Sequence, residues 1–193
     1  EAAASDHFEI GDRDVIAMAE SIVARSQGNY ASVEAISKDV RQKLGGETVG
    51  VIFPILSRNR FSMILKGIAL GAKKVVLMLS YPRDEVGNQL LTEDQLEEHN
   101  IDPYATVMNL EEYRRLFGEN LHPFTGVDYV EYYAEIVTAA GAEVEFVFAN
   151  HAKEILNYTN KVINCDVHTR QRTKRILKAQ GATVYGLDDL LTE

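Results

Sequence analysis

The sequence has a single cysteine, only four prolines and no apolar run long enough to span a membrane. A membrane-spanning helix needs about 18 or more consecutive apolar residues, so we expect no membrane partner. The lone Cys165 cannot form a disulfide within the chain, which is typical of the reducing cytoplasm. Residues 1–5 lack the basic and apolar regions of a signal peptide. The missing initiator methionine indicates a processed end or a segment of a longer chain.

Several common motifs for catalysis and nucleotide binding are also missing. The chain has no Walker A motif, no dinucleotide fingerprint of three spaced glycines, no Gly-x-Ser-x-Gly elbow and no metal-type pairing of cysteine and histidine. Any nucleotide must therefore be held by another arrangement of residues.

The chain has 193 residues, of which 46% are hydrophobic and 25% charged. These values are ordinary for globular proteins and exclude a disordered chain or a coiled coil. We therefore expect one domain over residues 1–193.

The net charge of −9 is unevenly distributed. Residues 83–145 contain 15 acidic and 3 basic residues, whereas ten of the 20 basic residues fall within 57–74 and 166–178. The acidic total argues against nucleic acid or a membrane surface as a general partner. The two basic runs leave room for a small anionic ligand.

Short apolar runs bounded by turn residues alternate with segments of helical periodicity. This pattern predicts an α/β fold, in which a mostly parallel sheet is layered between flanking helices. Residues 83–125 interrupt the alternation with acidic residues, prolines and two weak helices at 93–99 and 110–117, so we interpret them as an acidic helical insertion or lid. We expect strands at 15–19, 48–55, 73–80, 143–149, 162–167 and 183–185.

Ligands of open α/β sheets bind beyond the carboxyl ends of the strands, so the residues after each predicted strand are the candidates for a site. Ser57, Arg58, Asn59 and Arg60 follow the second predicted strand and precede a helix. Guanidinium groups match phosphate and carboxylate oxygens in pairs, and a helix start adds partial positive charge. These four residues are candidates for binding an anion or a nucleotide. The alternative interpretation is a solvated helix start that binds no ligand.

Three acidic residues are candidates for a metal site. Asp84 and Glu85 lie in a turn after the third predicted strand, and hard cations such as Mg²⁺ are bound by carboxylates together with substrate phosphates. Asp128 is a further candidate, although its place in the first turn of a helix is also explained by the helix dipole.

A denser cluster follows the fifth predicted strand. Asp166 and His168 are candidate catalytic residues, which would lie on one face if they continued the strand. Asp166 is also a candidate metal ligand. Thr169 and Arg170 are candidates for binding an anion at the start of the following basic helix. The alternative interpretation is a basic outer surface on that helix. Cys165 is expected to be buried and inert.

Residues 11–28, from Gly11-Asp12 through the Glu20-Ser21 pair to Gln27-Gly28, resemble the opening of the coenzyme F-420 γ-glutamyl ligases. The segments 54–61, 79–88, 124–129 and 165–170 are similar to a bacterial branch of that family. The resemblance implies addition of L-glutamate to an anionic deazaflavin precursor by a dimer that uses GTP and Mg²⁺ or Mn²⁺. Gly126-Val127-Asp128 is followed by Tyr129 rather than by the family's Ser-Asn, so the coenzyme itself is left open.

The leading hypothesis is a ligase, dependent on GTP or ATP and a divalent metal, that joins a carboxylate to an amine such as that of L-glutamate. A non-catalytic module that binds an anionic small molecule would use the same arginines without needing the carboxylates. An interaction domain that uses the acidic segment is the third alternative.

Overall fold

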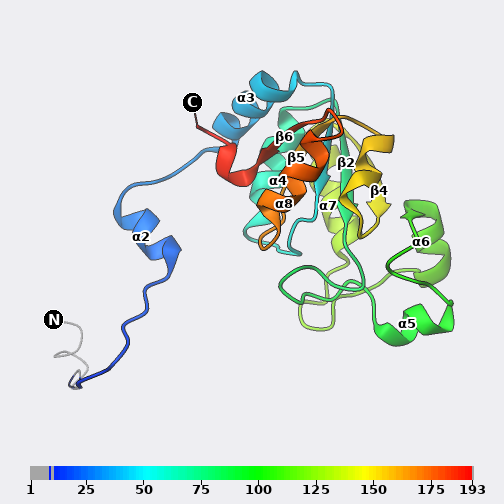
Figure 1. The fold of residues 1–193 in the computed structure, drawn as a ribbon, viewed down its shortest axis with the longest axis horizontal. Helices are drawn as coiled ribbons and strands as arrows, with labels where there is room; N and C mark the ends of the chain where they lie inside the picture. Colours follow the sequence, from blue (N-terminus) through cyan, green and yellow to red (C-terminus); the bar gives the residue numbers. More distant parts are fainter. Residues whose placement is uncertain (1–8, 10, 193) are drawn as a thin grey trace. The chain divides into compact units, whose positions relative to one another are not determined.

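A computed structural model describes residue 9 and residues 11–192 of the chain. The described residues fall into two compact units, one ending at Ala31 and one beginning at Ser32 (Figure 1). The expectation about the first five residues lies outside the described part.

The first unit contains one short helix, α2 (Glu20–Ser26), in which no residue is buried. The strand predicted at 15–19 is wrong, because these residues form no strand and their backbone N–H groups donate to no backbone carbonyl of the described residues. Val15 and Ile16 are 90% and 71% exposed. A strand needs a neighbouring strand to form hydrogen bonds with its backbone N–H and C=O groups. The apolar, β-rich composition of this segment predicts a strand but does not show whether such a neighbour exists.

The second unit is built on a single six-stranded sheet. Its strands are β1 (Thr48–Ile52), β2 (Lys74–Leu79), β3 (Met108–Asn109), β4 (Glu143–Phe148), β5 (Lys161–Asn164) and β6 (Thr183–Gly186). Their order is β3-β4-β2-β1-β5-β6, and all neighbours are parallel except β3, which runs antiparallel to β4. The predicted α/β fold with a mostly parallel sheet is confirmed.

The strand order reverses direction at the centre of the sheet. From β1 the chain adds β2 and β4 on one side, and then returns to add β5 and β6 on the other side. The loops that leave β1 and β5 therefore diverge from adjacent strands. Such a reversal opens a crevice beyond the carboxyl ends of the two strands, where doubly wound proteins bind their ligands.

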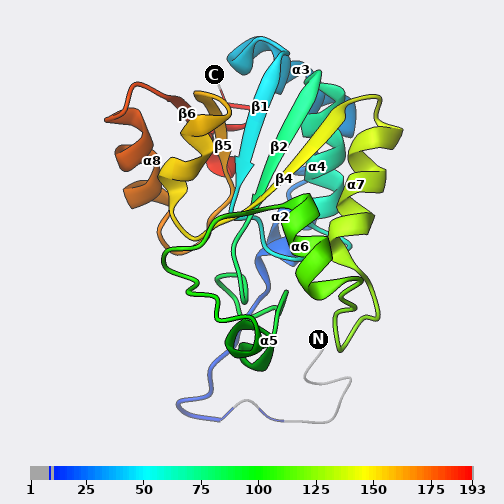
Figure 2. The same cartoon turned by 90° about the vertical axis from the view of Figure 1, so that its right-hand side faces the viewer.

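Helices cover both faces of the sheet (Figure 2). The helices α3 (Val33–Leu44), α4 (Phe61–Leu70) and α7 (Tyr129–Ala139) lie on one face, and the 3₁₀ helix η1 (Ala152–Asn157) and α8 (Arg170–Lys178) lie on the other. Each face has its own buried cluster of apolar side chains. Burial on both faces explains why residues 75–79 of β2 are all apolar and all buried.

The acidic insertion forms the two predicted helices, α5 (Glu93–Glu98) and α6 (Leu110–Phe117). Each begins with a capping box, from Thr92 to Gln95 and from Asn109 to Glu112. The ring of Tyr113 stacks on Phe148 of β4 at 4.1 Å, so the insertion shares the main core. α5 lies beyond the carboxyl ends of the central strands (Figure 2).

Candidate functional site

The loops that follow β1, β2, β4 and β5 meet at the carboxyl edge of the sheet, where the strand order reverses. A cleft of about 430 Å³ opens there, on the face covered by η1 and α8. Phe53, directly after β1, lines this cleft and has a left-handed backbone (φ 54°), which is rare for a residue with a side chain. Polar groups in the lining include Asn150, His151, Thr169 and Arg172.

Asp84 is buried and fastens the loop after β2 to the loop after β1. Its carboxylate accepts hydrogen bonds from the backbone N–H groups of Leu56 (2.8 Å), Val86 (3.0 Å) and Asn88 (2.8 Å), and from the Asn88 side chain (2.7 Å). Both oxygens are therefore fully used by the protein, which gives Asp84 a structural role in this conformation.

Glu85, the next residue, reaches in another direction, to the turn between β5 and α8. One carboxylate oxygen accepts hydrogen bonds from the backbone N–H groups of Val167 and His168, the latter at 3.0 Å. The other oxygen lies 3.4 Å from the hydroxyl of Thr169. Asp84 and Glu85 together connect three loops across the reversal point.

Asp166 is completely buried at the same turn. Its Oδ2 accepts from the Thr169 hydroxyl at 3.1 Å, but its Oδ1 has no hydrogen-bond partner among the described residues. An unpartnered buried carboxylate oxygen is costly. This atom therefore calls for a cation or a donor from a ligand.

The remaining residues of the turn differ from the expectation. β5 ends at Asn164, so strand alternation does not govern Asp166 and His168, and the buried Asp166 is followed two residues later by an exposed His168. Thr169 occupies the N-cap position of α8 but makes no capping bond, because its hydroxyl faces Asp166 and Glu85. Arg170 donates to the Asp166 carbonyl at 3.2 Å and its guanidinium lies 3.5 Å from Asp188.

Residues 57–60 directly precede α4, as predicted. The Ser57 hydroxyl organises the turn by accepting from the Arg60 backbone N–H at 3.1 Å and donating to Asn59 at 3.0 Å. Arg58 and Arg60 are exposed, and neither forms an ion pair within the described part of the chain. Both guanidinium groups are available to an anion.

Tyr133 of α7 fastens this loop to the helix. Its buried hydroxyl accepts from the backbone N–H of Ser57 at 2.8 Å and lies within 3.4 Å of the Ile55 carbonyl. Burial raises the pKa of Tyr133 far above its usual range, so the phenol stays neutral and keeps its proton as a donor.

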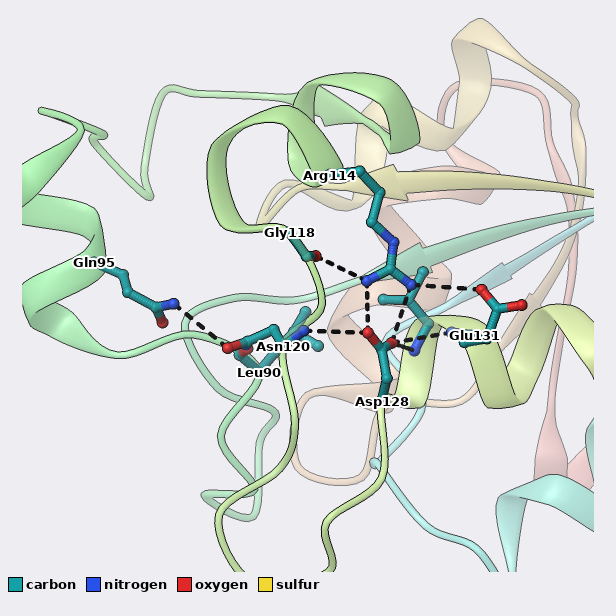
Figure 3. A network of polar contacts seen from close by, with 8 residues as sticks. Leu90, Gln95, Arg114, Gly118, Asn120, Asp128 and Glu131 are labelled. Carbon is teal, nitrogen blue, oxygen red and sulfur yellow. Dashed lines mark hydrogen bonds and ion pairs between the residues drawn. The ribbon is translucent and has the colours of Figure 1, made fainter.

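Asp128 belongs to a separate network that joins α6 to α7 (Figure 3). Arg114 forms a two-pronged ion pair with it, at 2.5 and 3.1 Å, and the backbone of Asn120 and the first turn of α7 also donate to it. Burial by itself raises the pKa of Asp128, but the hydrogen bonds from Arg114 and the backbone of Glu131 outweigh it and lower the pKa.

The three acidic residues expected to bind metal are therefore not gathered into one site. Within residues 9 and 11–192, no three acidic, histidine or cysteine side chains form a group that could hold a metal ion, and Asp84, Glu85 and Asp128 each already accept hydrogen bonds from the protein. The residue that best fits a divalent cation is Asp166, because its free oxygen is buried beside a hydroxyl. A single carboxylate suffices for Mg²⁺ when substrate phosphates supply further ligands.

Cys165 is buried, as expected. Burial, and then the negative charge of Asp166, raise the pKa of its thiol, which therefore stays protonated and unreactive. No helix among the described residues combines the length and the apolar character that crossing a membrane requires.

Comparison with known protein families gives a match over most of the chain. A family model described as F420-0:Gamma-glutamyl ligase matches residues 1–179, a range that includes every candidate residue of the site. No curated protein and no solved structure matches the chain.

Proposed function

Since the chain belongs to the F420-0:gamma-glutamyl ligase family, and is in that general sense a ligase, we propose that it joins a carboxylate to the amine of an amino acid such as L-glutamate. The family's description points to an anionic F420-0-type acceptor. The observation that carries the proposal is the buried Asp166 with its unpartnered oxygen, at the point where the strand order reverses.

The reaction proceeds in two steps in this proposal. The acceptor carboxylate takes the terminal phosphoryl group of GTP or ATP and the nucleoside diphosphate leaves. The amine then attacks the resulting acyl phosphate, an amide bond forms, and phosphate and a proton are released. Catalysis of this kind depends on positioning and on neutralising phosphate charge.

Residues of the chain divide this work. Arg58 and Arg60 neutralise anionic oxygens, and Asp166 with the Thr169 hydroxyl would hold Mg²⁺ or Mn²⁺, whose chemistry is to polarise phosphate oxygens. His168, which is exposed two residues after Asp166, is the residue to which we assign acceptance of the proton of the amine. We also propose a homodimer, as the resemblance implies, which light scattering of the purified chain tests. The single cysteine supports the further proposal of a cytoplasmic location.

The central experiment measures release of nucleoside diphosphate from GTP and ATP, with Mg²⁺ or Mn²⁺, L-glutamate and a panel of anionic acceptors. We expect turnover that requires both metal and amino acid, and that D166N loses at least about a hundredfold. D94N, an exposed acid on α5, is the matched control. Absence of metal-dependent nucleotide binding by calorimetry contradicts the proposal.

A further inference from the structure

The carboxylate of Glu85 is held in the way that proteins hold bound anions. Consecutive backbone N–H groups, from Val167 and His168 in the turn that precedes the N-cap residue of the nine-residue helix α8, converge on one of its oxygens, and the Thr169 hydroxyl faces the other. Successive backbone N–H groups in a turn form a concave binding site for anions such as phosphate. The chain thus places one of its own anions on an anion-binding turn.

The comparison with Asp84 distinguishes a removable anion from a fixed one. Asp84 is 6% exposed, and its four hydrogen bonds remain within the loops that it joins. Glu85 is only partly buried, and its contacts with the turn lie at the exposed surface. Hydrogen bonds open to water exchange readily with a dissolved anion, whereas those of Asp84 do not.

Asp166 provides an independent indication of a ligand at this turn. Its buried Oδ1 has no partner, and its Oδ2 shares the Thr169 hydroxyl with Glu85. The Thr169 hydroxyl carries a single proton, so it can donate to Asp166 or to Glu85 but not fully to both. No ion pair in the described part of the chain includes either carboxylate. Arg170 lies at the same turn, but it donates to the backbone carbonyl of Asp166 and not to its carboxylate, which leaves the free Oδ1 to a cation that arrives with the ligand.

We propose that the backbone N–H groups of Val167 and His168, with the Thr169 hydroxyl, bind a phosphate group of the substrate, and that Glu85 occupies this subsite until the substrate displaces it. The inference rests on the proposed function for the identity of the phosphate, which belongs to the nucleotide. A cation bound at Asp166 then lies next to the phosphate oxygens and offsets their repulsion by that carboxylate.

The test compares the binding of inorganic phosphate, in the presence of Mg²⁺, by the full-length wild type and by E85Q. Phosphate binds only while Glu85 is away from the subsite. The apparent affinity for phosphate is therefore the intrinsic affinity multiplied by the fraction of time that the subsite is free. With a minor open state of about 10% or less, E85Q should therefore bind phosphate at least about tenfold more tightly. The amide signals of Val167 and His168 should move most in a nitrogen-15 NMR titration. E97Q, an exposed glutamate on α5, should bind as the wild type does.

Equal or weaker phosphate binding by E85Q than by the wild type overturns the proposal. The proposal is also overturned if E85Q binds L-glutamate, but not phosphate, more tightly than the wild type does. If E85Q fails to fold, the wild type is titrated with phosphate while the side-chain carboxyl carbon of Glu85 is observed. A shift to the value of a solvated glutamate supports displacement, and an unchanged signal at saturation refutes it. Phosphate binding does not require turnover, so a positive result together with inactivity in the ligase assay would reject the proposed function alone.

Discussion

At the scale of single residues, the site contains two buried aspartates with opposite energetic roles. Asp84 satisfies four donors, whereas Asp166 leaves one oxygen without a partner. A fully hydrogen-bonded buried carboxylate stabilises a fold, and an unsatisfied one costs stability that functional sites often sacrifice. Substitution by asparagine separates these roles, because it keeps the size of the side chain and removes the charge.

We expect D84N to lower the free energy of unfolding by about 2–3 kcal/mol. In the variant, the side-chain NH₂ group takes the place of one carboxylate oxygen, so N–H groups that donate to Asp84 in the wild type lose their acceptor. Urea denaturation at neutral pH measures this change. A loss below about 0.5 kcal/mol would mean that the link from Asp84 to Leu56 contributes little.

We expect D166N to be at least as stable as the wild type when divalent metal is absent, because it removes an uncompensated buried charge. Addition of nucleotide with Mg²⁺ should raise the melting temperature of the wild type but not that of D166N. Thermal denaturation with and without ligand measures both effects. A D166N variant that is much less stable without ligand contradicts this assignment.

At the scale of helices, α4 approaches α3 closely at Gly71. A β-carbon on Gly71 would lie 2.7 Å from the backbone oxygen of Ser37, which cannot move without shifting α3. We therefore expect G71A to destabilise the protein by about 1–3 kcal/mol. K66A, at an exposed position of α4, should change stability by less than about 0.5 kcal/mol in the same denaturation experiment.

The ion pair of Arg114 with Asp128, which joins α6 to α7, should make the stability of the protein depend on pH. Asp128 has a lowered pKa in the folded protein, so it contributes stability above its unfolded value of about 3.9 and loses that contribution as the pH falls through the folded value. We expect D128N to be less stable than the wild type at pH 7, and the difference to shrink below about pH 4. A pH-independent difference in urea denaturation would show that charge is not involved.

The sequence predicted five of the six strands, both helices of the insertion and the position of the 57–60 turn. It misplaced 15–19 as a strand and missed β3, since a two-residue strand has no periodicity. The concentration of polar residues at Asp166, His168 and Thr169 is visible in the sequence, and their roles stay predictions. The bond from Glu85 to a turn 82 residues later was not predictable, because a long-range contact of one side chain leaves no local pattern.

At the scale of the whole molecule, the two units differ in their share of the core. All buried apolar residues of the described part, from Val40 onward, belong to the second unit. We expect a chain of residues 32–193 to fold cooperatively, with an unfolding free energy within about 1 kcal/mol of that of the full chain. Calorimetry of both chains tests this, and loss of the cooperative transition on truncation contradicts it.

The adjacency of Asp84 and Glu85 has a consequence for timing. The first residue is anchored in the interior and acts as a fixed pivot, and Gly87, with φ 90°, ends the turn in open space. In the proposed displacement, release of the Glu85 carboxylate therefore needs rotation about side-chain bonds and the loss of its hydrogen bonds to Val167 and His168, but no movement of the loop backbone. The backbone of the loop keeps its conformation and its entropy. A side-chain exchange of this kind is local, whereas the movement of a whole loop takes nanoseconds to microseconds.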